Sequence, residues 1–578
     1  MTLRSDRWFA RRDLSSFIHR AAMRAAGGRS VDDDRPIVGI CNPWSEFVNC
    51  NMHFRALSHA VKRGVRAAGG QPLEFPTIAL GENLMKPTTM LHRNLMAMDV
   101  EESIRAYPMD AVVLIGGCDK TVPAELMGAA SVDVPTIMIT GGPAEPTVYR
   151  GERLGSGTDL WKYADSYRAG RMAGEDWAAL EAAAGSTMGH CTEMGTASTM
   201  AAVVEALGLS LPGSAAIPAT DPRRISAADA TGRRAVQIAR EGPRPSQVLT
   251  AAAFDNAIAA LVAVGGSTNA VLHLLALAGR VGVPLTLERF ADVAECVPLL
   301  VNVRPAGEYL FEDVDNAGGT GAVLAELLPL LDGSALTIAG GTLASTLEGT
   351  NALDRDVIAS LDRPIGPRGG LAVLRGSLAP AGALLKRSAA SDRLLTHRGS
   401  AIVFDGIEDL GRRIDDPNLP VEPDSVLVLR NAGPVGGPGM PEWGMLPIPA
   451  KLARAGVDDM VRVSDARMSG TGFGTVVLHA APESAVGGPL ALIRDGDRVT
   501  LDVPSRRIDL DVEPAELERR RAHWRAPPPA YSRGYGALYL EHVEQADTGC
   551  DFDFLRKRPG EPPQSEPLGI LAGWHGGW

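Results

Sequence analysis

The stretch 111–123, AVVLIGGCDKTVP, constrains this chain more than any other. Its first five residues predict a buried strand, its glycine pair predicts a sharp turn, and Cys118, Asp119 and Lys120 follow at consecutive positions. Reactive side chains directly after a strand come to the carboxyl edge of a parallel sheet, where open α/β folds bind ligands. A loop cysteine beside a surface ion pair would explain the same residues, so this stretch alone leaves both interpretations open.

The first 370 residues repeat an order of strand, polar loop and helix. Strands are predicted at 36–40, 73–80, 111–115 and 134–140, and helices at 54–67 and 87–107. Asp13 is the expected N-cap of an earlier helix. This alternation is typical of a parallel sheet with helices on its faces. We therefore predict an N-terminal parallel-sheet α/β domain over residues 1–370.

After residue 370 the pattern changes to short β-like runs divided by Gly, Pro and Asp. These runs lie at 371–374, 401–404, 425–429, 460–463, 475–478 and 499–503. Their spacing predicts a second domain over residues 371–578, a compact β-barrel or sandwich followed by a C-terminal helix and tail. Two of its loops are rich in glycine, 436–444 with Glu442 and 464–472 with Ser469. Each is equally consistent with a surface turn or a catalytic loop.

Charge and hydropathy narrow the class of ligand. The chain has 578 residues with 69 acidic against 57 basic side chains, a formal charge of -12. This excess of negative charge argues against nucleic acid or an anionic membrane as a partner, and we expect a small molecule instead. The first residues contain no apolar segment, and the longer apolar stretches are interrupted by Gly, Ser or Asn. We therefore expect neither a signal peptide nor a membrane span, and a cytoplasmic protein.

Six cysteines are too few for a disulfide scaffold in so long a chain. Cys50, Cys118 and Cys191 lie in separate polar loops that could converge at one edge of the sheet. Three thiolates could hold an iron-sulfur cluster with one iron open to a substrate oxygen, whereas the paired short spacings of structural zinc sites are absent. Cys191 precedes a predicted helix N-terminus, which should lower its thiol pKa. Cys296, in an apolar run, is expected to be a small buried residue.

Five separated motifs, in this order, resemble the dihydroxy-acid and sugar-acid dehydratase family. They are NCNMH at 49–53, GCDK at 117–120, GHCTEMGTA at 189–197, PGMPE at 438–442 and SDARMSG at 464–470. The resemblance extends over about residues 4–555 and implies an α/β domain that carries an iron-sulfur cluster, followed by a β-barrel domain. The residues within these motifs resemble the sugar-acid branch, such as the L-arabinonate and D-xylonate dehydratases, more than the branched-chain biosynthetic branch.

The resemblance implies two sets of metal ligands. It implies that a 2Fe-2S cluster is held by Cys50, Cys118 and Cys191, and that Mg²⁺ is held by Glu82, Asp119, Lys120 and Glu442. Lys120 would act as a carboxylated side chain, because a carbamate supplies a hard oxygen ligand where a bare ammonium would repel the cation.

The resemblance also implies a reaction. Ser469 would be the base, held as an alkoxide by nearby positive charge, and Thr471 could position the substrate. The alkoxide would remove the C2 proton of an aldonate, favoured to be a pentonate, while cluster iron assists loss of the C3 hydroxyl. The product is a 2-keto-3-deoxy acid.

Several alternatives stay open. The chain could be a dihydroxy-acid dehydratase of branched-chain biosynthesis, or a catalytically inactive homologue that binds a metal or ligand. Cys41 is the rival of Cys50, which is preferred for its Cys-Asn-x-His context, and Glu193 could contact the cluster or the substrate. His575 in the tail could reach an active site but is left outside the predicted set. The family suggests a homodimer or homotetramer.

Two further glycine turns precede apolar helices, at 265–269 and 318–321. Either could cradle a carboxylate or a phosphate. A tight helix entry explains both equally simply, and is the favoured interpretation.

Overall fold

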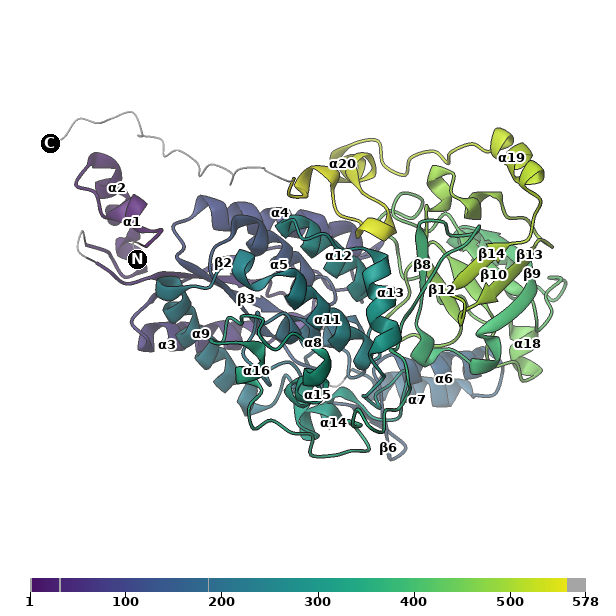
Figure 1. Ribbon diagram of the computed structural model, residues 1–578, viewed down its shortest axis with the longest axis horizontal. Helices are drawn as coiled ribbons and strands as arrows, with labels where there is room; N and C mark the ends of the chain where they lie inside the picture. The colour runs from purple at the N-terminus through teal and green to yellow at the C-terminus, as the bar shows by residue number, and fades with distance from the viewer. Residues whose placement is uncertain (1–2, 31–32, 186, 559–578) are drawn as a thin grey trace.

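The computed structural model describes residues 3–30, 33–185 and 187–558. Figure 1 shows its two main sheets at different ends of the molecule, with β3 among the helices of the N-terminal part and the strands from β8 onward at the other end. The N-terminal helices α1 (Asp6–Phe9) and α2 (Leu14–Ala22) lie at the outer edge of the first part.

The first sheet has four parallel strands in the order β2-β1-β3-β4. Their bounds are β1 (Ile37–Asn42), β2 (Gln71–Pro76), β3 (Ala111–Gly116) and β4 (Thr136–Thr140). The chain passes from β1 outward to β2 and then returns to the other side of β1 as β3. The strand order therefore reverses between β1 and β3, and such a switch point opens a crevice at the carboxyl ends of the two strands.

Helices cover both faces of this sheet. Val113 and Ile115 of β3 pack in one cluster with residues of α3 (Phe54–Ala67) and α9 (Pro222–Glu241). Val112 and Leu114, on the opposite face, join a larger cluster with residues of α5, α8 and α11: α5 (Thr121–Val132), α8 (Thr196–Ala206) and α11 (Ala251–Ala263). Side chains alternate between faces along a strand, so burial of both faces explains the uninterrupted apolar run of β3.

The second sheet is an eight-stranded barrel-like structure in the order β14-β13-β9-β10-β11-β12-β8-β7. Strands β9 to β12 are parallel neighbours, and the flanking pairs are antiparallel. A bridge between Arg375 and Arg507 brings the two end strands together. The bounds are β7 (Ala372–Leu374), β8 (Gly382–Leu385), β9 (Thr396–Asp405), β10 (Val426–Arg430), β11 (Arg462–Ser464), β12 (Val476–Ala481), β13 (Arg498–Asp502) and β14 (Arg507–Leu510).

The C-terminal segment returns to the N-terminal part. Helix α20 (Gly534–His542) lies near α4 (Met90–Ala106) in Figure 1. Arg93 of α4 donates to the carbonyls of Gly549 (3.0 Å) and Cys550 (2.8 Å), and Arg280 of α12 (Asn269–Val281) forms an ion pair with Asp551. These buried contacts fasten the end of the described chain to the α/β part. His575 lies outside the described residues.

The predicted fold class, a parallel-sheet α/β part followed by a β-barrel, is confirmed. Asp13 caps α2, because its carboxylate accepts from the Ser16 N–H at 2.8 Å. The strand predicted at 73–80 is wrong at its end, since β2 stops at Pro76 and Thr77 instead binds the Asp99 carboxylate. Strands β8 and β14 were not predicted; each has four residues, too few to show a clear alternation. The division at residue 370 stays a prediction.

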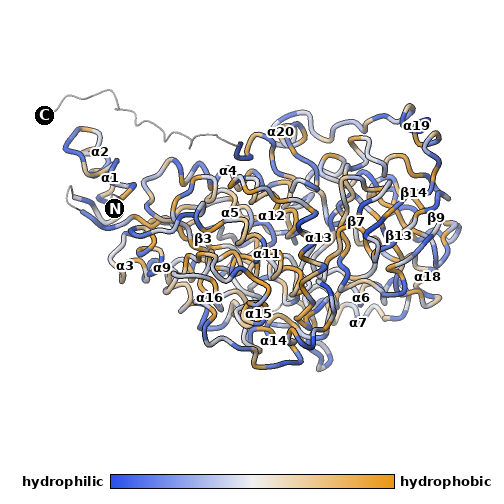
Figure 2. Tube along the Cα trace, viewed as in Figure 1, coloured by the Kyte–Doolittle hydropathy of each residue, from blue (hydrophilic) through white to orange (hydrophobic). Residues whose placement is uncertain are grey.

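Figure 2 shows hydrophobic residues gathered along the inner segments, such as β3 and α11, and hydrophilic residues along outer loops. None of the helices in the described part of the chain combines the length and the apolar character that crossing a bilayer requires.

Candidate active site

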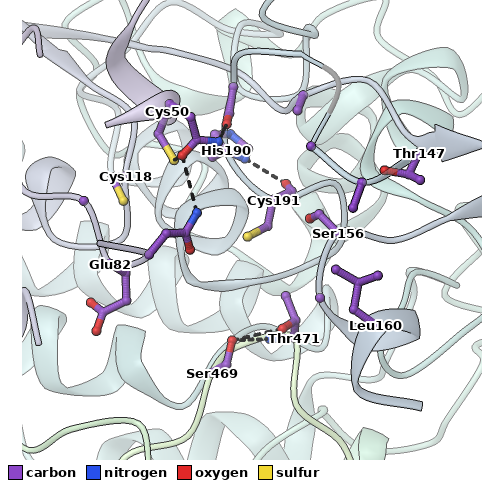
Figure 3. Close-up of a pocket in the computed structure, with 18 of the residues that line it drawn as sticks. Cys50, Glu82, Cys118, Thr147, Ser156, Leu160, His190, Cys191, Ser469 and Thr471 are labelled. Atoms are coloured by element: carbon purple, nitrogen blue, oxygen red, sulfur yellow. Dashed lines mark hydrogen bonds between the residues drawn. The ribbon is translucent and has the colours of Figure 1, made fainter. Parts of the chain in front are cut away.

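Loops from both sheets enclose a cavity of about 580 Å³ (Figure 3). Eight of the nine predicted site residues line it: Cys50, Glu82, Cys118, Asp119, Cys191, Glu442, Ser469 and Thr471. The ninth, Lys120, is fully buried directly behind the carboxylates. Residues separated by more than 400 positions in the chain therefore meet at one place.

The topology explains this meeting. Cys50 follows β1 and Cys118 follows β3, the two strands at the switch point of the first sheet. Glu442 and Ser469 lie in the loops after β10 and β11, which are parallel neighbours in the barrel. Because the carboxyl ends of parallel neighbours share one edge, each sheet brings several of its loops to the cavity, among them the loop after β2 that carries Glu82.

The turn after β3 requires glycine. A Cβ at Gly117 would lie 2.5 Å from Cζ of Phe54 and 3.1 Å from the Cys50 carbonyl oxygen, so any other residue would displace the buried Phe54 ring. The Thr121 hydroxyl accepts hydrogen bonds from the N–H groups of Gly117 (3.0 Å) and Cys118 (2.9 Å) and closes the turn. The turn thus directs Cys118 into the cavity and ends at the first turn of α5.

Two of the three thiols, those of Cys50 and Cys191, lie in an environment that disfavours thiolate. The neighbouring Cys118 thiol, followed by burial, raises the pKa of Cys50 well above its ordinary value. Burial, with Glu193 and Asp119 as further causes, likewise raises the pKa of Cys191. The expectation that a helix N-terminus lowers the pKa of Cys191 is therefore wrong: α8 begins at Thr196, five residues later, and burial dominates.

The carboxylates, by contrast, surround a cation. The Lys120 Nζ lies 3.1 Å from Glu82 Oε2, 3.3 Å from Asp119 Oδ2 and 3.4 Å from Glu442 Oε1. Burial and Arg467 act to lower the pKa of Lys120, but the carboxylates outweigh them and raise it to about 12. Burial acts to raise the pKa of Glu82, but Lys120 and Arg467 outweigh it and bring the pKa to about 2.

Two residues that contact Glu442 were not predicted. Arg467 Nη1 donates to Glu442 Oε1 at 2.9 Å, and Asn269 Nδ2 donates to the same oxygen at 3.1 Å. Arg467 also donates to the Thr88 hydroxyl, which in turn donates to Glu82 at 2.7 Å. Arg467 belongs to the motif that contains Ser469, and Asn269 ends the first glycine turn, but only the tertiary structure brings them to Glu442.

Ser469 and Thr471 form a hydroxyl pair at the lower edge of the cavity in Figure 3, with 2.9 Å between their oxygens. Within the described residues Ser469 has no hydrogen bond to a histidine or a carboxylate. A conventional serine–base pair is therefore not the arrangement here.

Comparison with known proteins agrees with this geometry. Residues 35–346 match the family model for the N-terminal part of dihydroxy-acid/6-phosphogluconate dehydratases, and residues 356–550 match the model for the C-terminal part. The chain belongs to the dihydroxy-acid/6-phosphogluconate dehydratase family. Within this family, the members are hydro-lyases, and the resemblance drawn from the five motifs is confirmed.

Individual members of the family differ in the substrate that their names state. An L-arabinonate dehydratase of Rhizobium leguminosarum bv. trifolii is 48% identical, over 96% of each chain. A 6-deoxy-6-sulfo-D-gluconate dehydratase of Pseudomonas putida is 47% identical, over 97% of this chain and 98% of its own. A dihydroxy-acid dehydratase of Sulfolobus acidocaldarius is 39% identical, over 92% of this chain and 95% of its own.

Cys41, Cys296 and Glu193 are not among the described residues that line the cavity. Cys41 is buried within β1 beside Glu125, so Cys50 and not Cys41 lines the cavity. The expectation that Cys296 is buried is wrong: it is exposed on the outer side of α13 (Leu287–Cys296). Glu193 is buried and accepts from the N–H groups of Gly157 and Thr158, both at 2.7 Å, so it anchors that loop.

The two remaining glycine turns are helix entries. Gly265 precedes α12 and Gly318 precedes α15 (Gly319–Leu327). Neither turn is among the described residues that line the cavity.

The ligand assignments stay predictions. Within residues 3–30, 33–185 and 187–558, no three His, Cys, Asp or Glu side chains already stand in a geometry that could hold a metal ion. The three carboxylates instead surround the Lys120 ammonium.

Proposed function

We propose that this protein dehydrates a sugar acid, an aldonate, to the corresponding 2-keto-3-deoxy acid. The observation that carries the proposal is the convergence of three thiols, three carboxylates and the Ser469–Thr471 hydroxyl pair on one cavity. Family membership supports the reaction type, and the L-arabinonate dehydratase relative supports the substrate class.

The donor sets fit the two proposed metal groups. Cys50, Cys118 and Cys191 would hold a 2Fe-2S cluster, since thiolate sulfur is the ligand that such clusters use. Oxygen ligands suit Mg²⁺, and Glu82, Asp119 and Glu442 already approach one point, the Lys120 Nζ. When bound, these groups supply the Lewis acidity that weakens the C2–H and C3–OH bonds of the substrate.

The chain's own hydroxyl pair performs the proton step. The Ser469 alkoxide takes the C2 proton, and the Thr471 hydroxyl, 2.9 Å away, holds the Ser469 oxygen in place. The electron pair of the C2–H bond forms the C2=C3 double bond as hydroxide leaves C3. The proton on Ser469 then neutralises this hydroxide, which leaves as water, and the enol tautomerises to the 2-keto acid.

The far side of the cavity favours a substrate with an uncharged tail. Figure 3 shows Thr147, Ser156 and Leu160 on the side away from Cys118 and Glu82. The described residues that line the cavity include Glu145 but no Lys or Arg that could bind a phosphate or sulfonate. Hydroxyl side chains pair well with the hydroxyls of a pentonate or a hexonate.

A second candidate is a dihydroxy-acid dehydratase with a branched-chain substrate. Leu160, Trp161 and Trp177 give the same wall an apolar part that could cover a short aliphatic tail. The more distant dihydroxy-acid dehydratase relative makes this the weaker candidate.

The test is a substrate panel on protein purified without oxygen. The panel contains L-arabinonate, D-xylonate, D-gluconate, 6-phosphogluconate and 2,3-dihydroxyisovalerate, with 2-keto acid as the product measured. We expect a brown protein with about two iron atoms per chain that converts the uncharged aldonates. D-Gluconate is the matched control for 6-phosphogluconate, because the two differ only at C6. Preferred turnover of dihydroxyisovalerate would favour the second candidate, and no 2-keto acid from any substrate would contradict both.

We further propose that the enzyme acts in the cytoplasm as a homodimer or homotetramer without nucleic-acid partners. Light scattering after size-exclusion chromatography of the iron-loaded protein measures its oligomeric state, and a monomer would contradict this part.

A further inference from the structure

The loop that carries Ser469 is fixed by side chains from three other segments. Its Met468 carbonyl accepts from Asn269 at 3.2 Å, and its Thr471 carbonyl accepts from the Thr158 hydroxyl at 2.9 Å. Between them, the Gly470 carbonyl accepts from Lys386 Nζ at 3.0 Å. Lys386 directly follows β8, and Thr158 begins α6 (Thr158–Arg168). Asn269, Thr158 and Lys386 therefore hold the backbone on both sides of Ser469 and determine the position of its hydroxyl.

Lys386 differs from the other two because it is charged. Lys386 is only 1% exposed, and among the described residues it forms no ion pair. Glu193 is the charged group in electrostatic reach, and it is already held by Ser156 Oγ at 2.9 Å and by backbone N–H groups. Burying an ammonium costs several kcal/mol. A neutral donor would hold a carbonyl without that cost, so the charge itself calls for an explanation.

The same loop rests on the positive end of a helix. A Cβ added at Gly470 would lie 2.5 Å from the backbone nitrogen of Thr196, the first residue of the eleven-residue helix α8. The N-terminus of a helix carries partial positive charge. Gly470, the neighbour of Ser469, thus lies between this N-terminus and the Lys386 ammonium.

Positive charge is what a serine base requires. A serine hydroxyl is too weak an acid to lose its proton near neutral pH without nearby cations. Preorganised charge close to the site of a developing anion is worth more in a buried site than in water. Burial lowers the pKa of Lys386 to about 7, so about half of the Lys386 side chains are charged at pH 7 and more of them below it.

We propose that Lys386 is a positioning residue for Ser469: it holds the Gly470 carbonyl, and in its ammonium form it supplies positive charge that favours the Ser469 alkoxide. This inference rests on the proposed function, in which Ser469 takes the C2 proton. It assigns to the chain itself part of the charge that would otherwise come only from the metal groups.

The experiment compares variants that separate charge from position. Lys386→Met removes both the charge and the hydrogen bond, Lys386→Gln keeps an N–H donor without charge, and Lys386→Arg keeps the charge. Thr158→Val is the matched control, because it removes an uncharged support of the same loop. Each protein is first checked for wild-type circular dichroism and iron content. The pH profile of kcat/KM and the kinetic isotope effect with C2-deuterated substrate are then measured.

We expect Lys386→Met and Lys386→Gln to lower kcat about 100-fold with KM nearly unchanged. The acid limb of their kcat/KM profile should move to higher pH by about one unit, because Ser469 loses a nearby positive charge. Their isotope effect should rise because proton removal becomes slower. Lys386→Arg should retain the wild-type acid limb. Thr158→Val should lose activity without moving that limb.

An unmoved acid limb in a folded Lys386→Met or Lys386→Gln protein, or an equal shift in Thr158→Val, would overturn the inference. If both uncharged variants fail to fold while Lys386→Arg folds, Lys386 serves the fold and the inference is also overturned. A wild-type protein without dehydratase activity would instead contradict the proposed function, so the two failures are distinguishable.

Discussion

The two sides of the cavity treat charge in opposite ways. On the carboxylate side, Glu82, Asp119 and Glu442 face two cations of the chain itself, Lys120 and Arg467. On the thiol side, Cys50, Cys118 and Cys191 face one another and nearby carboxylates, and the pKa of both Cys50 and Cys191 is raised. The carboxylate side can therefore hold its charges without a ligand, whereas thiolates on the other side need a positive group from outside the chain.

Carboxylation of Lys120 would change this balance. It would replace the central cation by an anion and leave Arg467 as the counter-charge nearest to Glu442. The carboxylate side would then need an external cation as much as the thiol side does. The bare and carboxylated forms of Lys120 are thus two charge states of the site, and Mg²⁺ suits the second.

The largest effect is expected from a substitution that removes one of the three thiols. If Cys118 is a cluster ligand as proposed, Cys118→Ser should lower dehydratase activity by on the order of 1,000-fold or more, because the two remaining thiols would not retain the proposed cluster. Iron content and visible absorbance of anaerobically purified protein measure the loss. Cys41→Ser is the matched control, since Cys41 is buried but does not line the cavity, and it should retain its iron. Loss of iron in the Cys41 variant would instead favour Cys41 over its rival Cys50 as a ligand.

The next largest effect is expected from a substitution that removes the Lys120 ammonium from the carboxylate side. Lys120→Met should lower the free energy of unfolding of the metal-free protein by about 3–5 kcal/mol, because buried carboxylates lose their partner. Lys62→Met is the control: Lys62 pairs with Glu74 at a partly exposed position, and its loss should cost less than about 1 kcal/mol. Urea denaturation measures both. Equal costs for the two variants would show that Lys120 does not compensate the carboxylates.

A smaller effect is expected in the pH dependence of stability, where Glu205, a buried carboxylate held by backbone N–H groups, can be compared with Glu82. Glu205 is more deeply buried than Glu82, and the hydrogen-bond partners of its carboxylate among the described residues are the N–H groups of Gly213 and Ala215. Burial raises the pKa of Glu205 to about 7. Its folded-state pKa lies above the unfolded value, so its contribution to stability is complete below about pH 4.5 and is lost as pH rises through 7. The pKa of Glu82 is instead lowered, to about 2, so the contribution of Glu82 to stability is present above pH 4.5 and is lost as the pH falls below it.

Denaturation between pH 4.5 and 8 tests the Glu205 part. Glu205→Gln should remove a pH-dependent loss of up to about 3 kcal/mol. An unchanged pH dependence in this variant would mean that the Glu205 pKa is not raised.

The sequence predicted the parts of the site that depend on local order. Strand ends, glycine turns and five motifs placed all nine predicted residues around or directly behind one cavity. It did not predict the contacts of Arg467 and Asn269 with Glu442, or that of Lys386 with Gly470, because each joins segments more than 20 residues apart through tertiary packing. It also misjudged Cys296 and the pKa of Cys191, since burial is a property of the folded chain.

The central claim, that Ser469 is the base in a cavity built for two metal groups, has a direct test. Wild-type and Ser469→Ala proteins are prepared without oxygen to equal iron content and mixed with C2-deuterated L-arabinonate in a single turnover. The wild type should form the 2-keto acid with a primary isotope effect, and Ser469→Ala should keep its iron but form product at least about 1,000-fold more slowly. An iron-loaded Ser469→Ala protein that forms the keto acid at the wild-type rate would contradict the account.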